Sequence, residues 1–374
     1  MQVKAEYDIE EFDSSDVTVV ATDGEGRRAE RSFVLAVMPG PEALIPSVSG
    51  NNYGVSSSVS GDTAVVGAYS GDSVFVFHRN PDNSWSEVQK LTGTANSWFG
   101  YAVALRDDML VVGAGSTSGK YAKVYKKQAD GTFNEIQTLS GSGRFGYSVA
   151  ADGNTVVIGD WSNAKVYVYE IQPDGTLGTT AAATLSGGSG SYFGDSLAVD
   201  GDTIFVGAYY EGSMTVYSRA TGEWVQVSKF TGTGKDVSGG LYGYRVAVKG
   251  NVGFFSHVKD NSAGTNAGSV WVVERQPNGT WATVKKLTAS NPSSGALFGE
   301  SVAFDGEVAI IGALKGDHAY AFRKSGGTWV QSSILEIPAS YSTLSVISVS
   351  MSNDKALVSL GGTGVSVAYV LPTP

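Results

Sequence analysis

The chain alternates between short apolar runs and polar turns, and this pattern recurs with a nearly constant period. Each period opens on a run with apolar residues at alternate positions, such as Val103 and Leu105, which is typical of a half-buried strand. A polar turn and a continuous apolar run follow, as at residues 308–311, and the continuous run indicates a strand buried on both faces. Two further runs complete the period, which therefore predicts four strands.

An aromatic residue followed by glycine marks the start of each period. Successive starts lie 46 to 56 residues apart, and a degenerate copy begins at Ser345. Turn-forming Gly, Asn and Asp lie eight and nine residues after most of these anchors, and these residue types tolerate the positive φ that tight hairpin turns need. The aromatic–glycine pairs are Tyr53-Gly54, Phe99-Gly100, Phe145-Gly146, Phe193-Gly194, Tyr242-Gly243 and Phe298-Gly299.

Seven periods of four strands predict an all-β fold, a seven-bladed β-propeller of four-stranded antiparallel blades spanning residues 39–374. In a propeller each blade covers the apolar faces of its neighbours. The alternative is an open solenoid of small sheets, which would need a polar capping repeat at each end. No such repeat is visible in the sequence, which favours a closed ring.

The last period is too short for a fourth strand, because the chain ends at Pro374. A missing outer strand would leave an unpaired sheet edge. The segment 32–46 contains two apolar runs, 33–37 and 43–45. We predict that part of this segment pairs with residues 365–370 and closes the ring.

Residues 1–38 have a different pattern. The runs 17–22 and 33–37 flank a polar, glycine-containing stretch, which is similar to the final hairpin of a cadherin-like or immunoglobulin-like module. Only the last third of such a module would be present, so the chain would be part of a larger multidomain surface protein. An N-terminal arm that packs on the propeller is the alternative.

The repeat resembles the FG-GAP repeat, the unit of the integrin alpha-subunit propeller and of many bacterial and algal surface proteins. The resemblance covers about seven-eighths of the chain. Calcium-binding members carry a carboxylate-rich loop between the first two strands, whereas here that connection is a tight turn such as Asp200-Gly201-Asp202. Because calcium takes six to eight oxygen ligands, we expect no metal site in these turns. The best copy reads Phe298-Gly299-Glu300-Ser301-Val302-Ala303, then Asp305-Gly306, then Ile310-Ile311-Gly312-Ala313.

Composition narrows the class of partner and the compartment. The formal net charge is -10, which disfavours binding to nucleic acid. No apolar run approaches the ~20 residues of a membrane-spanning helix, so we expect no membrane insertion. The chain has no cysteine and therefore no disulfide. The absence of cysteine, together with the resemblance to FG-GAP proteins, predicts an extracellular or cell-surface protein of bacterial or marine type. The first residues form no signal peptide, so we expect a longer precursor.

The candidate ligand-binding residues are aromatic. In a propeller, the loops between the second and third strands share one face with the loops that lead into the next blade, and here these loops vary in length. Aromatic side chains on such loops could stack on sugar rings or anchor a protein partner, although they could also merely fill gaps between blades. The candidates are Tyr69, Trp98, Trp161, Tyr192, Tyr209 and Tyr210.

Catalytic signals are weak. The chain has three histidines and lacks nucleophile-elbow, zinc-protease, phosphate-loop and cofactor-binding motifs, so we expect neither an enzyme nor a cofactor. His257 and His318, near Asp260 and Asp317, are more consistent with ordinary loop residues than with a metal or acid–base site.

The leading hypothesis is therefore an adhesion or binding module for a protein or glycan. One rival is a polysaccharide-active enzyme, hinted at by Arg245, Asp195 and Glu300 just after their anchors. The other rival is a structural spacer of a large adhesin.

Overall fold

A computed structural model describes residues 15–22, 28–35, 42–47, 52–219, 222–232, 241–314, 318–336, 345–352, 355–361 and 366–372. The chain divides into two compact units, Met1–Pro41 and Glu42–Pro374. Within the first unit, β1 (Ser15–Thr22) and β2 (Arg28–Leu35) pair antiparallel, with Ser15 opposite Leu35. The two strands match the hairpin expected from the sequence, whereas membership of a cadherin-like or immunoglobulin-like module stays a prediction.

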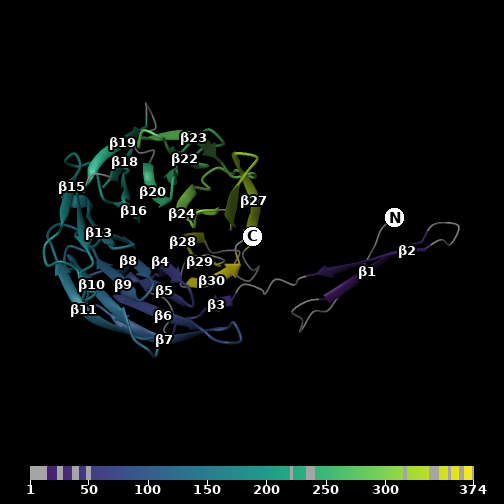
Figure 1. Cartoon of the computed structure of the whole chain (residues 1–374), viewed down its shortest axis with the longest axis horizontal. Helices are drawn as coiled ribbons and strands as arrows, with labels where there is room; N and C mark the ends of the chain where they lie inside the picture. The colour runs from purple at the N-terminus through teal and green to yellow at the C-terminus, as the bar shows by residue number, and fades with distance from the viewer. Residues whose placement is uncertain are drawn as a thin grey trace. The chain divides into compact units, whose positions relative to one another are not determined.

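The second unit is a circular array of small antiparallel sheets (Figure 1). Six blades each contain four consecutive strands, hydrogen-bonded in chain order. The first three blades are β4 (Tyr53–Ser60), β5 (Thr63–Ala68), β6 (Ser73–Arg79), β7 (Trp85–Thr92); β8 (Phe99–Arg106), β9 (Met109–Ala114), β10 (Tyr121–Lys127), β11 (Phe133–Ser140); and β12 (Ser148–Asp152), β13 (Thr155–Asp160), β14 (Lys165–Glu170), β15 (Ala183–Ser186). The next three are β16 (Ser196–Asp200), β17 (Thr203–Ala208), β18 (Ser213–Ser218), β19 (Val225–Thr231); β20 (Tyr242–Lys249), β21 (Val252–His257), β22 (Ser269–Arg275), β23 (Trp281–Leu287); and β24 (Phe298–Phe304), β25 (Val308–Ala313), β26 (His318–Ser325), β27 (Thr328–Glu336).

One further four-stranded sheet combines both ends of this unit. It contains β28 (Ser345–Ser352), β29 (Lys355–Gly361), β30 (Ser366–Pro372) and β3 (Glu42–Leu44). Glu42 lies opposite Val370, and Leu44 lies opposite Ala368. The first strands contact one another in succession from β4 to β28, and β28 contacts β4. The predicted pairing of the N-terminal segment with residues 365–370 is therefore confirmed, and Glu42–Leu44, which overlaps the run 43–45, contributes the strand.

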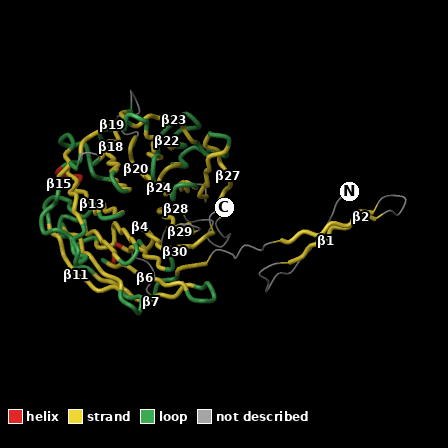
Figure 2. Tube along the Cα trace, viewed as in Figure 1, coloured by secondary structure: helices red, strands yellow, loops and turns green. Residues whose placement is uncertain are grey.

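Strands account for almost all regular structure in the described residues (Figure 2). The helical turns are the 3-10 elements η1 (Tyr69–Gly71) and η2 (Trp161–Asn163). The all-β propeller of four-stranded antiparallel blades is confirmed. Its tight turns are also as predicted between the first and second strands: Asp200 pairs with Thr203, for example, which leaves two residues in the turn. The predicted turn pair 353–354 lies outside the described residues.

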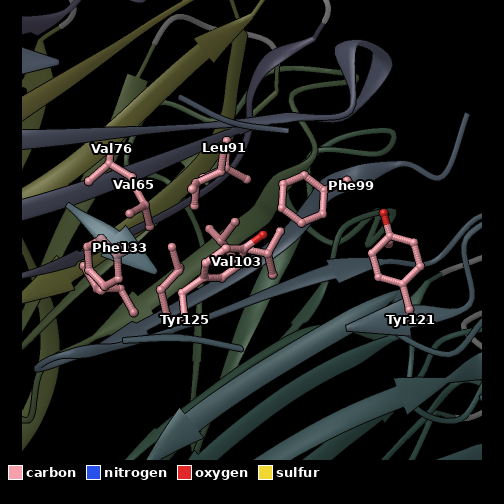
Figure 3. Packing of buried hydrophobic residues seen from close by; sticks show 13 residues of the cluster. Val65, Val76, Leu91, Phe99, Val103, Tyr121, Tyr125 and Phe133 are labelled. Atoms are coloured by element: carbon pink, nitrogen blue, oxygen red, sulfur yellow. The ribbon is translucent and has the colours of Figure 1, made fainter. Parts of the chain in front are cut away.

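Apolar side chains of adjacent blades form the core. In the cluster of Figure 3, Val65 and Val76 of one blade pack with Phe99, Tyr125 and Phe133 of the next. Successive side chains of a strand point to opposite faces of its sheet, so the continuous apolar strands, such as β5 with every residue buried, present apolar residues to both neighbouring blades. All six aromatic anchors are buried, which agrees with a structural role for them.

The periodic glycines allow neighbouring blades to touch. Gly146 follows its anchor with φ +86°, and a Cβ there would overlap the carbonyl oxygen of Tyr121 in the preceding blade. A Cβ on Gly113, in the second strand of that preceding blade, would overlap the carbonyl oxygen of Gly146. Only glycine meets both the left-handed backbone conformation and this close approach. The repeated glycines of the sequence motif thus lie where one blade packs on the next.

Candidate functional site

The first strands of the blades line an axial channel, and one end of this channel opens on the face of the variable loops. The second residue after each anchor is Val55, Tyr101, Tyr147, Asp195, Tyr244, Glu300 or Ile347. A cavity of about 210 Å³, called here the axial mouth, is lined by Val55, Tyr101, Tyr147, Asp195, Arg245 and Ile347, among others.

The channel changes character along its length. Next to the axial mouth its wall carries apolar side chains, including Leu105, Val199, Val248 and Phe304. A second cavity of about 570 Å³ lies at the end of the tight turns, and its lining includes Arg106, Asp107, Asp152, Lys249 and Asp305. Polar groups therefore occur at both ends of an apolar passage.

Nine aromatic side chains form a continuous belt on the loop face. At one end, the ring centroids of Tyr69 and Trp98 are 5.7 Å apart, and those of Trp98 and Tyr101 are also 5.7 Å apart. The Tyr101 ring lies 4.5 Å from that of Tyr147, in the next blade. The members of this aromatic belt are Tyr69, Trp98, Tyr101, Tyr147, Trp161, Tyr192, Tyr209, Tyr210 and Tyr244.

The belt continues across the following blades with similar spacing. Tyr147 and Trp161 are 5.8 Å apart, and Trp161 and Tyr192 are 4.3 Å apart. Tyr192 stacks on Tyr210 at 5.1 Å and meets Tyr209 edge-on at 5.2 Å. Tyr209 in turn lies 5.5 Å from Tyr244 on β20, so the belt reaches from the first blade to the fifth.

All six aromatic residues named from the sequence belong to this belt. Tyr69 and Trp161 open the 3-10 turns η1 and η2, and Trp98 and Tyr192 directly precede their anchors. Tyr210 is 66 % exposed, and the other five are partly exposed. The rings therefore both pack against one another and present surface to solvent, whereas their role in binding stays a prediction.

Trp98 and Tyr192 have an unusual backbone conformation. Their φ angles are 62° and 58°, in the left-handed region that bulky residues rarely adopt. Leu241 and Leu297, at the same position of two other repeats, share it. The left-handed conformation is therefore a feature of the turn before each of these anchors. In two repeats this turn places a ring of the belt on the loop face.

Arg144 connects two tryptophans of the belt. Its guanidinium carbon lies 4.9 Å from the Trp98 ring centroid and 5.7 Å from that of Trp161. Nη1 donates to the carbonyl oxygen of Gly115 at 3.3 Å. These distances are those of cation–π contacts, which add a positive charge to an otherwise neutral aromatic surface.

A charged cluster lies at the axial mouth. Arg245 Nη1 is 3.8 Å from Asp195 Oδ2, and Nη2 is 3.9 Å from Glu300 Oε1. Tyr244 donates its hydroxyl to Glu300 Oε1 at 3.0 Å and accepts from Arg245 Nη2 at 3.2 Å. The guanidinium carbon also lies 4.0 Å from the centroid of the Tyr244 ring. We call these four residues the axial cluster.

Burial changes the titration of the axial cluster. The side chain of Asp195 is 5 % exposed, and burial raises the pKa of its carboxyl to about 7, although Arg245 acts in the opposite direction. Burial also raises the pKa of Glu300 against the effect of Arg245. Asp195 therefore gains its charge near neutral pH, which is unusual for a carboxyl group.

Several members of this site were missed from the sequence. Tyr101, Tyr147 and Tyr244 share the second position after their anchors, on the strand face that bears the apolar residues at offsets four and six. Reading that offset across the repeats would have found them. Arg144 gives no comparable signal, because its contacts with two tryptophans depend on how two blades meet.

The histidines noted from the sequence do not meet in a cluster. His257 is buried, and its Nδ1 lies 3.7 Å from Asp260 Oδ2. His318 begins β26 and contacts the Tyr320 ring, and Asp317 lies outside the described residues. Within the described ranges, no three potential metal-ligating side chains of the His, Cys, Asp or Glu type come together.

Comparison with known proteins identifies the repeat. The FG-GAP repeat matches residues 85–125 and 281–330. Each match crosses a blade boundary and contains an anchor, Phe99 or Phe298. The β-propeller therefore contains two segments that match the FG-GAP repeat. The matches confirm the resemblance inferred from the aromatic–glycine pairs.

Solved structures support the propeller fold. A functionally unknown protein from Desulfotomaculum acetoxidans is 16 % identical, with a TM-score of 0.56 over 75 % of this chain and 85 % of that one. The WD40 β-propeller domain of Doa1 is 12 % identical, with a TM-score of 0.60 over 90 % and 98 % of the two chains. A protein from Lactobacillus plantarum is 13 % identical, with a TM-score of 0.54 over 84 % and 90 %.

At these identities the likeness concerns the fold alone. No curated protein sequence matches the chain. Among the described helical segments, none has the length and apolar character needed to cross a bilayer.

Proposed function

We propose that this propeller is an extracellular or cell-surface binding module that holds a carbohydrate ligand on its loop face. The observation that carries the proposal is the aromatic belt, nine partly exposed rings in contact across five blades. Aromatic faces stack on the apolar faces of sugar rings, and a row of such rings suits an extended chain. The composite sheet counts here as the seventh blade, which completes the ring that supports this face.

Polar groups beside the belt support a carbohydrate over a purely apolar ligand. The hydroxyl groups of Tyr101 and Tyr147 and the guanidinium of Arg144 lie among the rings. A sugar needs both stacking surfaces and hydrogen-bonding groups, and this surface combines them. Because Trp, Tyr and Arg also dominate protein–protein hot spots, a protein ligand is the alternative. If the propeller binds neither glycan nor protein, a spacer role in a large adhesin remains.

The test is a binding screen with matched tryptophan variants. The purified propeller is titrated by calorimetry with soluble neutral and acidic polysaccharides, and a pull-down from surface extracts covers protein ligands. We expect Trp161→Ala to weaken glycan binding by about 2 kcal/mol, roughly 30-fold. Trp224→Ala serves as the control, because Trp224 is also partly exposed but lies beside Arg219 before β19, away from the belt. Equal effects of the two variants would contradict the proposal.

A polysaccharide-active enzyme is a second candidate, and one observation favours it. Arg245, Asp195 and Glu300, the residues singled out from the sequence for this possibility, lie together at the axial mouth. A carboxyl group with a pKa near 7 is suited to proton transfer. An assay for new reducing ends, on the polysaccharide that binds best, separates the candidates: turnover abolished by Asp195→Asn would support the enzyme, and absence of turnover would support the binding module.

A further inference from the structure

The axial mouth contains a hydrogen-bond donor and two acceptors that do not bond to one another. Arg245 lies 3.8 Å from Asp195 and 3.9 Å from Glu300, beyond hydrogen-bonding distance from both carboxylates. Its Nη1 and Nη2 donate to the backbone carbonyl and the hydroxyl of Tyr244 instead. Arg245 is one-third exposed, so a ligand can reach the guanidinium.

Within the described part of the chain, the carboxylate of Asp195 is the clearest case of a polar group in the axial mouth without a hydrogen bond. Its side chain is 5 % exposed, it lines the cavity, and among the described residues no hydrogen bond reaches its carboxylate. Buried polar groups in proteins are almost always hydrogen-bonded, and leaving one unbonded costs about 1–3 kcal/mol. Asp195 pairs with Arg245 at 3.8 Å but accepts no hydrogen bond from the described residues, so its carboxylate at the cavity wall can accept one from a ligand.

The charges of the cluster select the type of ligand. The carboxylates of Asp195 and Glu300 would repel an anion. The guanidinium of Arg245 would repel a cation. A neutral hydroxyl group avoids both conflicts, because it donates to a carboxylate and accepts from a guanidinium at the same time. Two adjacent hydroxyl groups would do so for Asp195 and Arg245 together. On the same wall, Tyr101 and Tyr147 provide ring faces.

The dimensions of the mouth limit how much of a ligand can enter. Its volume of about 210 Å³ is below the roughly 300–1,000 Å³ of ordinary small-molecule sites. Beyond it the channel wall is apolar, with Leu105, Val199 and Val248, so hydroxyl groups would lose their hydrogen bonds there. One sugar-sized group therefore fits, and a polar chain would not continue through the channel.

We propose that the axial mouth is a terminal subsite, which binds the end ring of a neutral polyhydroxylated chain through hydroxyl groups bridging Arg245 and Asp195. This inference rests on the proposed carbohydrate function, since the remaining units of the chain would lie on the aromatic belt. Tyr101 and Tyr147 belong to both the belt and the cavity wall, so the two surfaces are continuous. The propeller then recognises chain ends, whereas a belt acting alone would bind the middle of a chain equally well.

The test uses the intact propeller and neutral hexasaccharides. Cellohexaose, laminarihexaose, mannohexaose and xylohexaose are titrated by calorimetry, each unmodified, reduced to the alditol, or capped by a bulky ether at the non-reducing end. We expect one of the two end modifications to weaken the best binder by at least about tenfold. With the corresponding long polymer, the number of propellers bound per chain should stay constant as chain length increases.

Two variants locate the effect. Arg245→Gln should reproduce the loss caused by the end modification and make the modified and unmodified hexasaccharides bind equally. Arg106→Gln is the matched control, because Arg106 lies at the opposite end of the channel and pairs with Asp107 at 3.3 Å. The end modifications are tested on the wild-type protein, so the inference remains testable even if Arg245→Gln fails to fold.

The possible results separate the two proposals. If Trp161→Ala weakens binding but both end-modified hexasaccharides bind as tightly as the native one, the terminal subsite is wrong and the belt stands. If bound propellers increase in proportion to polymer length, the terminal subsite is likewise wrong. If the wild type binds none of the neutral probes, the carbohydrate function is wrong for neutral glycans, and the subsite falls with it.

Discussion

The hydroxyl oxygens of Tyr101 and Tyr147 lie 2.6 Å apart, in hydrogen-bonding contact across the boundary between two blades. Both residues occupy the second position after an anchor, and burial raises the pKa of both phenols, which therefore stay neutral hydroxyl groups. The pair helps to join the blades and also lines the axial mouth. Substitution here would disturb packing and ligand binding together, so tryptophans further out on the belt give a cleaner test of function.

Ring closure by β3 can be tested at two adjacent residues. Leu44 is fully buried among Tyr53, Val59 and Leu357, whereas Ile45 is 69 % exposed. We expect Leu44→Ala to lower the free energy of unfolding by about 2–5 kcal/mol, because it leaves a cavity where the two ends of the unit meet. Ile45→Ala should change it by less than about 0.5 kcal/mol. Urea denaturation measures both, and similar values for the two variants would exclude β3 as the closing strand.

The anchor aromatics should be essential for stability. Phe145 is 1 % exposed and packs with Val156, Ile158 and Tyr169 between two blades. Phe145→Ala should cost about 3–5 kcal/mol of unfolding free energy. The control is Ile136→Ala, on the outer strand β11, where the side chain is 37 % exposed. A loss below about 1 kcal/mol for Phe145→Ala would contradict the structural assignment of the anchors.

The glycine after the anchor should tolerate no side chain. Gly146→Ala places a methyl group against the carbonyl oxygen of Tyr121 and also imposes the cost of φ +86°. Gly153→Ala, at φ +54° in an open turn, imposes only the conformational cost of about 1–2 kcal/mol. Thermal unfolding of the two variants should therefore show a clearly larger loss for Gly146→Ala. Equal losses would mean that close blade contact is not what the motif glycine provides.

The titration of Asp195 predicts a pH-dependent effect of Asp195→Asn. The pKa of this carboxyl is about 7 in the folded state, beside Arg245 and Glu300, and about 3.9 in an unfolded chain. Between these values the folded state binds the proton more tightly, so the wild type loses stability as pH rises from about 4 to 7. Since the amide mimics the neutral acid, we expect the variant to gain up to about 4 kcal/mol relative to the wild type between pH 4 and pH 8.

Urea denaturation across that pH range measures the difference. Asp62→Asn, which removes an exposed turn carboxylate beside Arg79, is the control for the general effect of the substitution. A constant difference between Asp195→Asn and the wild type from pH 4 to pH 8 would show that Asp195 ionises normally, and the electrostatic description of the axial cluster would then be wrong.

Much of the fold could be predicted from local chemistry. The alternation at Val103 and Leu105 and the turn residues Gly201 and Asp202 act within single repeats, so their pattern predicts the strands directly. The closing strand followed from counting strands, because an incomplete last repeat needs a partner. The sequence could not distinguish residues 43–45 from residues 33–37 as the closing strand, because both runs are apolar. The observed strand pairing distinguishes them.

The site was predictable only in part, because it depends on contacts between repeats. Tyr69, Trp98, Trp161, Tyr192, Tyr209 and Tyr210 were found because loops on one face of a propeller share a position in every repeat. The cation–π contacts of Arg144 arise between blades, and no local pattern indicates them. The raised pKa of Asp195 likewise depends on its burial by the surrounding strands. This burial cannot be predicted from the residues next to Asp195 in the sequence.

Oxidative footprinting of tryptophan would locate the ligand on the propeller. Trp98, Trp161 and Trp224 are all partly exposed, so each is open to labelling in the free protein. With the tightest-binding glycan present, we expect oxidation of Trp98 and Trp161 to fall several-fold while that of Trp224 stays the same. Protection of Trp224 without protection of Trp98 and Trp161 would place the ligand elsewhere and would contradict binding on the aromatic belt.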